Sequence, residues 1–219
     1  MRFSPTPLLW VVVIGTLLCA GCTSNLTAPD VSTTELRVHS DAPVYVQYGT
    51  GDCFAKKEIP GNMVLRFASI RCTVNYAYFN KTSNNTGNEV LQVDLVRDGK
   101  VIKSYSTVNG SVGFYKIDEF LAESVKDPGL AQAVPVTVKI VTEGEWGGDI
   151  GDKYGGLYET RTGPATLTLN QPVLPVKGCI RNTGDSSPSA LAVELYRGET
   201  LLNRSDTRSA SGETCVTYP

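Results

Sequence analysis

The residues best able to do chemistry in this chain are its six cysteines and its single histidine, His39. Four of the cysteines follow the apolar N-terminal leader: Cys53, Cys72, Cys179 and Cys215. An even number of cysteines in an exported chain indicates disulfide bonds. A metal site is the rival interpretation, but no pair has Cys-x-x-Cys spacing and one histidine cannot complete a zinc set. We therefore expect disulfides and no metal at these thiols.

Catalysis has little support in the sequence. There is no Gly-x-Ser-x-Gly elbow, no His-Glu-x-x-His helix and no phosphate loop. His39 lies in a segment of alternating apolar and polar residues, and nothing marks a nucleophile for it. Pairs of Asp and Glu could serve a glycosidase, yet the sequence alone does not pair them. We expect a protein that is not an enzyme and that needs no cofactor.

The first 21 residues have the pattern of a secretory signal. A basic start, Met1-Arg2, precedes an apolar stretch from Leu8 to Leu18, and small residues follow before Cys22. The apolar run is shorter than the ~20 residues that span a bilayer. We predict that residues 1–21 are removed; an ordinary signal in which Cys22 is incidental is the alternative.

The residues Ala20-Gly21-Cys22 resemble the lipobox of bacterial lipoproteins, although Cys19 stands where that family usually has Leu. The resemblance covers only the first two dozen residues. It implies cleavage before Cys22, lipidation of the Cys22 sulfur with diacylglycerol, and a membrane partner reached through that anchor. Thr23 follows the cysteine where an Asp would mark retention at the inner membrane, so the resemblance implies the cell envelope and favours the outer membrane.

Composition places the rest of the chain among folded globular proteins. The formal net charge is −2, and no cluster of Lys and Arg forms a basic patch, so we expect no nucleic-acid partner. Residues 22–34 are too polar to form a core, and we expect them to be a tether. Alternation with period two, as in 35–39 and 44–48, predicts an all-β fold.

One short helix interrupts the predicted strands. Asp118 is suited to cap it, and Pro128-Gly129 to end it. The apolar residues spaced to share one face of this helix are Ile117, Phe120, Leu121 and Val125.

An internal echo organises the chain. Residues 91–102 closely match residues 191–202, and both read as two strands joined by a tight turn. We expect Val93, Leu95, Val193 and Leu195 to face inward. Chance likeness of two generic hairpins is the alternative.

The order of strand, Asn-Thr-Gly loop and hairpin is similar to bacterial immunoglobulin-like adhesion modules of the CARDB type. The resemblance covers about 40 residues in each copy and implies two β-sandwich modules, which we place at 35–142 and 164–219. Pairing within modules favours Cys53–Cys72 and Cys179–Cys215 among the three possible arrangements. The resemblance further implies that the second bond joins opposite sheets of its sandwich.

Residues 143–163 are rich in glycine and carry Trp146, Tyr154 and Tyr158. We predict a long loop at the module boundary, whose three rings form a contact surface for a sugar or a protein. The alternative is that the rings fold back over the sheets. The acidic residues of this segment could also hold calcium, but their spacing is not that of an EF-hand.

These observations favour a cell-envelope lipoprotein that acts as a non-enzymatic binding or scaffolding module with a protein or glycan partner. Two alternatives stay open. One is an inhibitor or immunity lipoprotein directed against a toxin or hydrolase, and the other is a component of a secretion or surface-appendage apparatus.

Overall fold

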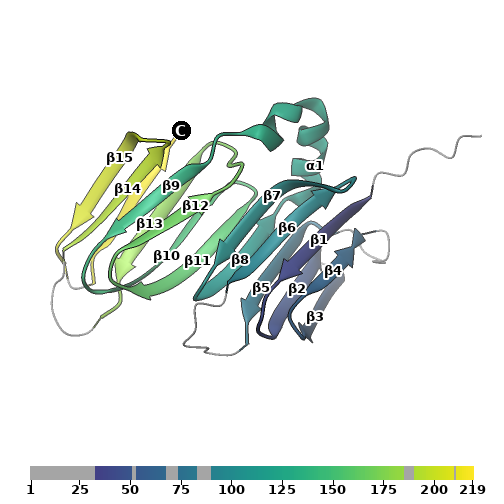
Figure 1. The fold of residues 1–219 in the computed structure, drawn as a ribbon, viewed down its shortest axis with the longest axis horizontal. Helices are drawn as coiled ribbons and strands as arrows, with labels where there is room; N and C mark the ends of the chain where they lie inside the picture. The colour runs from purple at the N-terminus through teal and green to yellow at the C-terminus, as the bar shows by residue number, and fades with distance from the viewer. Residues whose placement is uncertain (1–32, 51–52, 68–73, 83–89, 185–189, 210) are drawn as a thin grey trace, which may run out of the picture. The chain divides into compact units, whose positions relative to one another are not determined.

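The computed structural model describes residues 33–50, 53–67, 74–82, 90–184, 190–209 and 211–219, which belong to one compact unit, Ser32–Pro219. Within these residues the fold is all-β with one short α-helix, which confirms the predicted fold class (Figure 1). Cys22 and the predicted signal lie outside the described residues. So does Cys72, and nothing is described of the Cys53 side chain, so the predicted Cys53–Cys72 bond stays a prediction.

Strands follow one another closely along the chain. In the first half they are β1 (Thr34–His39), β2 (Val44–Thr50), β3 (Cys53–Ile59), β4 (Met63–Arg66), β5 (Tyr76–Lys81), β6 (Leu91–Arg97), β7 (Lys100–Thr107) and β8 (Gly110–Tyr115). The helix α1 (Ile117–Lys126) and a 3-10 turn, η2 (Pro128–Gln132), come next. In the second half the strands are β9 (Val136–Val141), β10 (Glu145–Asp152), β11 (Gly155–Thr162), β12 (Ala165–Leu169), β13 (Val176–Asn182), β14 (Leu191–Arg197), β15 (Thr200–Thr207) and β16 (Glu213–Tyr218).

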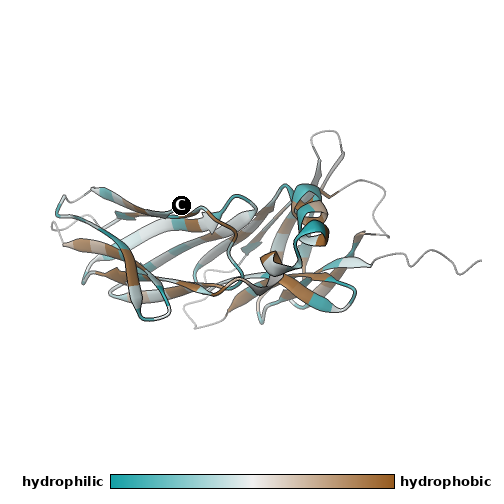
Figure 2. Ribbon diagram, turned by 90° about the horizontal axis from the view of Figure 1, so that it is seen from above, coloured by the Kyte–Doolittle hydropathy of each residue, from teal (hydrophilic) through white to brown (hydrophobic). Residues whose placement is uncertain are grey.

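The strands form three antiparallel sheets. Sheet A has the order β4-β1-β6-β7, and sheet C has the order β12-β9-β14-β15. Sheet B is continuous through eight strands, in the order β16-β13-β10-β11-β8-β5-β2-β3. One cluster of buried apolar side chains, which includes Leu36, Phe79, Trp146 and Val193, draws on all three sheets. Hydrophobic and hydrophilic residues are interspersed along the strands (Figure 2), as expected for sheets that bury one face.

The two halves of the chain have the same topology. Replacing each strand of sheet A by the strand eight places later gives the order of sheet C, and the same operation turns β3-β2-β5-β8 into β11-β10-β13-β16. We call β1–β8 the first lobe and β9–β16 the second lobe. The eight-stranded sheet arises because β8, the last strand of the first lobe, pairs with β11 of the second lobe.

Residue registers show how closely the lobes correspond. The predicted sequence repeat forms two equivalent hairpins, β6–β7 and β14–β15. Each hairpin has a register shift at the same place, after Leu95 and after Leu195. Their inward residues are buried as predicted. The likeness extends to turns, since Gly61 and Gly163 occupy equivalent turns with φ of 112° and 78°. The repeated sequence thus coincides with a topology that recurs across both lobes.

Three boundary predictions were wrong. Residues 143–163 are not a loop, because β10 and β11 form a hairpin in the middle of sheet B. The second lobe therefore begins at β9, and 35–142 and 164–219 are not the structural modules. The helix begins at Ile117 after Lys116, which adopts a left-handed conformation, so Asp118 is not its cap. Val125 lies on the exposed side of the helix, 59% accessible.

Candidate functional site

The outer face of sheet B, turned away from sheets A and C, carries a groove of about 610 Å³. Its floor is a row of three glycines that lie opposite one another on adjacent strands: Gly151 on β10, Gly156 on β11 and Gly113 on β8. Lys177 on β13 and Tyr78 on β5 continue the row on either side. The floor therefore combines residues from both lobes.

The absence of side chains in this row has two different consequences. A Cβ on Gly151 would collide with the carbonyl oxygen of Gly155, so the close approach of β10 and β11 excludes any side chain. A Cβ on Gly113 would lie 2.7 Å from the hydroxyl oxygen of Tyr115. The Tyr115 side chain thus lies across the glycine floor. Because glycine has no side chain, nothing from the floor projects into the groove.

Tyrosines flank the groove. Tyr78, Tyr115 and Tyr158 all line it, and the Tyr115 side chain is 49% exposed. Burial, followed by the nearby charges of Asp149 and Tyr78, raises the pKa of the Tyr115 hydroxyl. The phenol therefore stays protonated at neutral pH and remains able to donate a hydrogen bond.

Charged side chains of both signs surround these rings. Asp149, Lys177 and Glu213 line the main groove, and Arg181 lines an adjoining hollow of about 250 Å³ that shares Asp149 and Tyr158 with it. All four charged residues are exposed. The groove therefore offers hydrogen-bond donors and acceptors above apolar ring surfaces.

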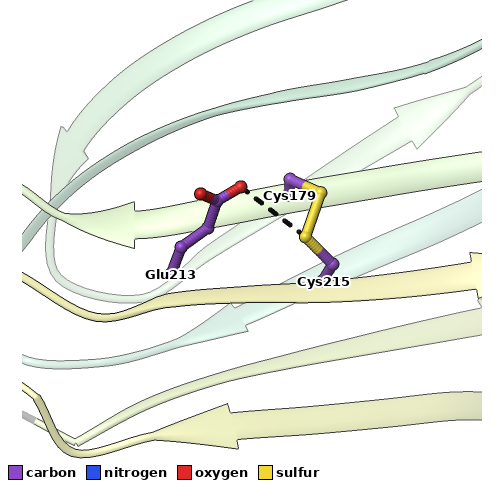
Figure 3. Close-up of side chains that lie close together, drawn as sticks. All are labelled: Cys179, Glu213 and Cys215. Atoms are coloured by element: carbon purple, nitrogen blue, oxygen red, sulfur yellow. Dashed lines mark hydrogen bonds between the residues drawn. A yellow bond between two sulfur atoms is a disulfide. The ribbon is translucent and has the colours of Figure 1, made fainter.

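One disulfide borders the groove (Figure 3). Cys179 and Cys215 are bonded, with Cα atoms 4.2 Å apart, and they lie directly opposite each other on the adjacent strands β13 and β16. The predicted pairing is present, but the expected location was wrong: the bond lies within one sheet and does not cross the sandwich. In the first lobe the equivalent opposite pair is Tyr78 and Gly113.

Glu213 approaches this disulfide, with an oxygen 3.6 Å from the Cys215 sulfur. Among the described residues, Cys179, Glu213 and Cys215 are the cluster whose ligand atoms come close enough together for a metal ion. The two sulfurs are bonded to each other, however, and a disulfide offers no thiolate to a metal. We assign the disulfide a structural role at the groove's border.

The three aromatic residues of 143–163 have different surroundings. Trp146 and Tyr154 are 0% and 1% exposed, and the Trp146 indole donates a hydrogen bond of 2.8 Å to the Gly163 carbonyl. Of the three, Tyr158 alone reaches the outer face and the groove. The predicted three-ring contact surface is thus reduced to one ring, because strand alternation turns Trp146 inward and Tyr158 outward.

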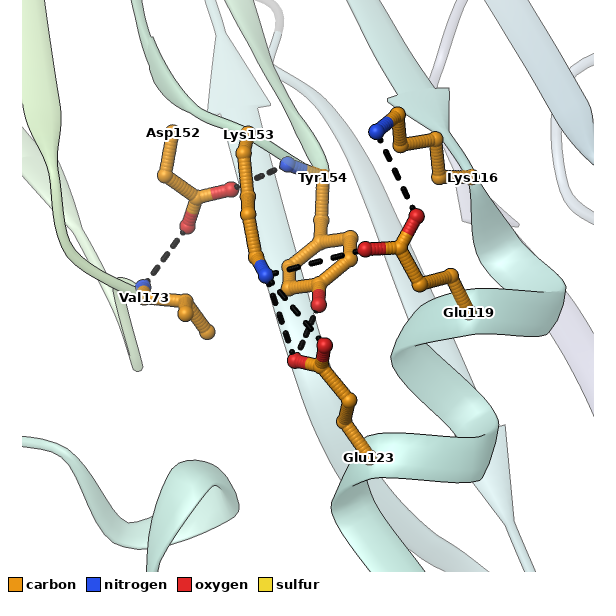
Figure 4. Close-up of polar contacts among 7 residues, drawn as sticks. All are labelled: Lys116, Glu119, Glu123, Asp152, Lys153, Tyr154 and Val173. Atoms are coloured by element: carbon orange, nitrogen blue, oxygen red, sulfur yellow. Dashed lines mark hydrogen bonds and ion pairs between the residues drawn. The ribbon is translucent and has the colours of Figure 1, made fainter.

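Tyr154 belongs to a polar cluster that attaches α1 to the β10–β11 turn (Figure 4). Its hydroxyl donates a hydrogen bond to the Glu123 carboxylate. Lys153 forms ion pairs with Glu123 at 3.3 Å and with Glu119 at 3.7 Å. The hydrogen bond from Tyr154 is the main cause that lowers the pKa of Glu123.

A buried ion pair joins the lobes beneath the groove. Lys103 of β7 lies 2.6 Å from Asp152 of β10, and both side chains are fully buried. The other oxygen of Asp152 accepts hydrogen bonds from the Tyr105 hydroxyl and the Tyr154 amide. The amide of Val173 donates to the oxygen that faces Lys103 (Figure 4). Asp152, one of the acidic residues of 143–163 that could have held calcium, is instead enclosed by protein donors.

Glu159 fixes the lobe junction at a second point. Its buried carboxylate accepts hydrogen bonds from the Thr107 hydroxyl and from the amides of Val108 and Asn109, at 2.7 to 2.9 Å. Arg161 pairs with it at 3.1 Å. These contacts hold the turn after β7 against β11 and form part of the seam between the two lobes.

Sequence reasoning missed most of this groove. Tyr78, Tyr115 and Lys177 come from strands distant in the chain, and only the pairing β5-β8-β11-β10-β13 brings them together. The available signal was the density of glycine in 143–163, where Gly147, Gly148 and Gly151 all fall within one strand. Glycine inside a strand often marks a site where another backbone or a ligand approaches closely.

Comparison with known proteins adds no family to these observations. No protein-family model matches the chain, and no curated protein or solved structure is significantly similar to it. Among the described residues, no helix has the length and apolar character needed to cross a membrane.

Proposed function

We propose that this protein is a lipid-anchored component of the bacterial cell envelope that binds a glycan, without catalysis, in the groove of sheet B. The observation that supports the proposal is the glycine floor flanked by Tyr115 and Tyr158. The apolar C–H faces of a sugar ring pack well on aromatic side chains. Sugar hydroxyls both donate and accept, which suits a groove that offers Asp149 and Lys177 together.

The same features argue against other ligand classes. Asp149 and Glu213 stand beside Lys177 and Arg181, so the groove is not the uniformly basic surface that the phosphates of a nucleic acid require. An extended peptide that adds to a sheet needs unpaired backbone groups at an edge. Beneath the groove the strands β8, β11 and β10 each have a neighbour on both sides. A glycan needs no such backbone pairing, so we favour it over a peptide.

Binding of soluble peptidoglycan fragments and other envelope oligosaccharides, measured by calorimetry, tests the groove. We expect the double variant Tyr115→Ala, Tyr158→Ala to lose affinity by roughly 30-fold or more, because truncating central aromatic contacts commonly costs about 2 kcal/mol. Tyr196→Ala is the matched control, since Tyr196 lies on β14 of sheet C. Equal affinity of the wild type and the double variant would overturn the groove assignment.

The anchor is tested separately at Cys22. Following the lipobox resemblance, we expect Cys22→Ser to abolish acylation and to leave the precursor uncut by the lipoprotein peptidase. Mass spectrometry of the mature N-terminus, with fractionation of the envelope, provides the measurement. A mature wild-type chain that begins elsewhere and carries no diacylglycerol would refute the anchor while leaving the groove proposal intact.

A further inference from the structure

The two end strands of sheet B, β16 and β3, correspond to the two strands that join the lobes, β8 and β11. Within the chain, β8 pairs with β11 in antiparallel fashion. By the correspondence of strands eight places apart, β16 is the equivalent of β8, and β3 is the equivalent of β11. Among the residues that the structure describes, those two strands are the edges of sheet B. One end of the sheet therefore carries the counterpart of β8 and the other end carries the counterpart of β11, the two strands that pair at the internal junction.

We propose that copies of this chain associate head to tail, with β16 of one copy pairing with β3 of the next as β8 pairs with β11. Because the two contacting surfaces differ, the contact is heterologous and leads to a ring or to an open filament. This inference extends beyond the proposed glycan binding and does not rest on it.

The register of the internal junction defines the register of the proposed one. Tyr158, which lies opposite Asp149, faces Ser111 across the internal junction. Lys56 holds the place of Tyr158, because each lies five residues before the equivalent turn glycines, Gly61 and Gly163. Lys56 lies opposite Gln47 on β2, the strand equivalent to β10. Glu213 holds the place of Ser111, because each lies two residues before the equivalent positions Cys215 and Gly113.

This correspondence places Lys56 directly opposite Glu213 of the neighbouring copy. Both positions are exposed. Opposite charges at directly paired positions stabilise an antiparallel strand pair, and like charges there destabilise it. The next pair in the same register is Ala55 with Thr214, two small side chains that do not obstruct the approach of the strands.

One difference between the internal junction and the proposed contact determines how strongly we expect copies to associate. The buried carboxylate of Glu159 fixes the internal junction, and the equivalent residue of β3 is Lys57. A lysine cannot accept hydrogen bonds from backbone amides. We therefore expect association that is reversible and weaker than the internal seam, and that strengthens when anchoring concentrates the chains on a membrane.

Charge exchange tests the proposal on the full mature chain in detergent. Sedimentation and light scattering over a range of concentrations should show mass increasing beyond the monomer. Glu213→Lys and Lys56→Glu should each weaken association by roughly tenfold at low salt, and the double exchange should restore it. Glu199→Lys is the control, because it makes the same charge change in the exposed β14–β15 turn.

A zero-length carbodiimide cross-link provides the positional test. In a mixture of isotopically light and heavy chains, we expect hybrid peptides that join Lys56 of one copy to Glu213 of another. Circular dichroism of each variant confirms that the fold is retained. A wild type that stays monomeric at every concentration, a double exchange that fails to restore association, or hybrid cross-links only between other surfaces would each overturn the proposal.

Discussion

At the scale of single residues, aromatic side chains from the same segment of the sequence have different surroundings in the fold. Trp146 and Tyr158 both belong to one glycine-rich stretch, yet one is enclosed in the core and the other lines the groove. The outcome depends on strand parity, which can be read only once the segment is known to be a hairpin. The composition of the segment therefore indicates a contact surface but does not predict which of its aromatic rings belong to it.

The contact between Tyr154 and Glu123 depends on pH. The Tyr154 hydroxyl lowers the pKa of Glu123 below its ordinary value of 4.5. A carboxyl group whose pKa falls on folding stabilises the folded state above its ordinary pKa, and this contribution is lost as the pH falls through the lowered value. We expect the attachment of α1 to weaken below about pH 4.5, the ordinary value of that carboxyl.

Hydrogen exchange of the α1 amides between pH 7 and pH 3 measures this loosening. Glu123→Gln keeps a hydrogen-bond acceptor for Tyr154 but cannot titrate, so its α1 protection should depend less on pH than that of the wild type. Glu143→Gln is the matched control, because Glu143 lies in the β9–β10 connection away from α1. Identical pH dependence in all three proteins would show that Glu123 does not govern the attachment.

At the scale of secondary-structure elements, alternation predicted the strands more reliably than the loops between them. The hairpins β6–β7 and β14–β15 were predictable because apolar residues alternate and a glycine turn joins the strands. The hairpin β10–β11 was not, because Gly147, Gly148 and Gly151 occupy strand positions that propensity assigns to loops. Neighbouring backbones and leaning tyrosine rings take the place of the missing side chains.

Disulfide location shows the same limit. Pairing by module correctly joined Cys179 to Cys215, since both lie in the second lobe. The expected bridge between sheets followed from a resemblance, whereas the register places the two cysteines on neighbouring strands. Register depends on contacts between distant segments, so the sequence could not specify it.

At the scale of the whole molecule, the two lobes share one sheet and one core, and this affects how stability is distributed. Two separate modules would unfold independently, but here both lobes contribute strands to sheet B and side chains to one core. The buried pair of Lys103 and Asp152 also connects them. Local damage at this seam therefore affects both lobes, and we expect the described unit to unfold in one cooperative step.

The variant Lys103→Met tests this cooperativity. Removing the ammonium leaves the Asp152 charge buried without its partner, a change that typically destabilises by about 3–5 kcal/mol. In a chain without the leader and its Trp10, Trp146 fluorescence follows the second lobe, and hydrogen exchange in β1–β8 follows the first. Both probes should shift together in denaturant. Lys139→Met, the same substitution at an exposed position on β9, should change stability by less than about 1 kcal/mol. Two separate transitions in the wild type would show that the lobes unfold as independent domains.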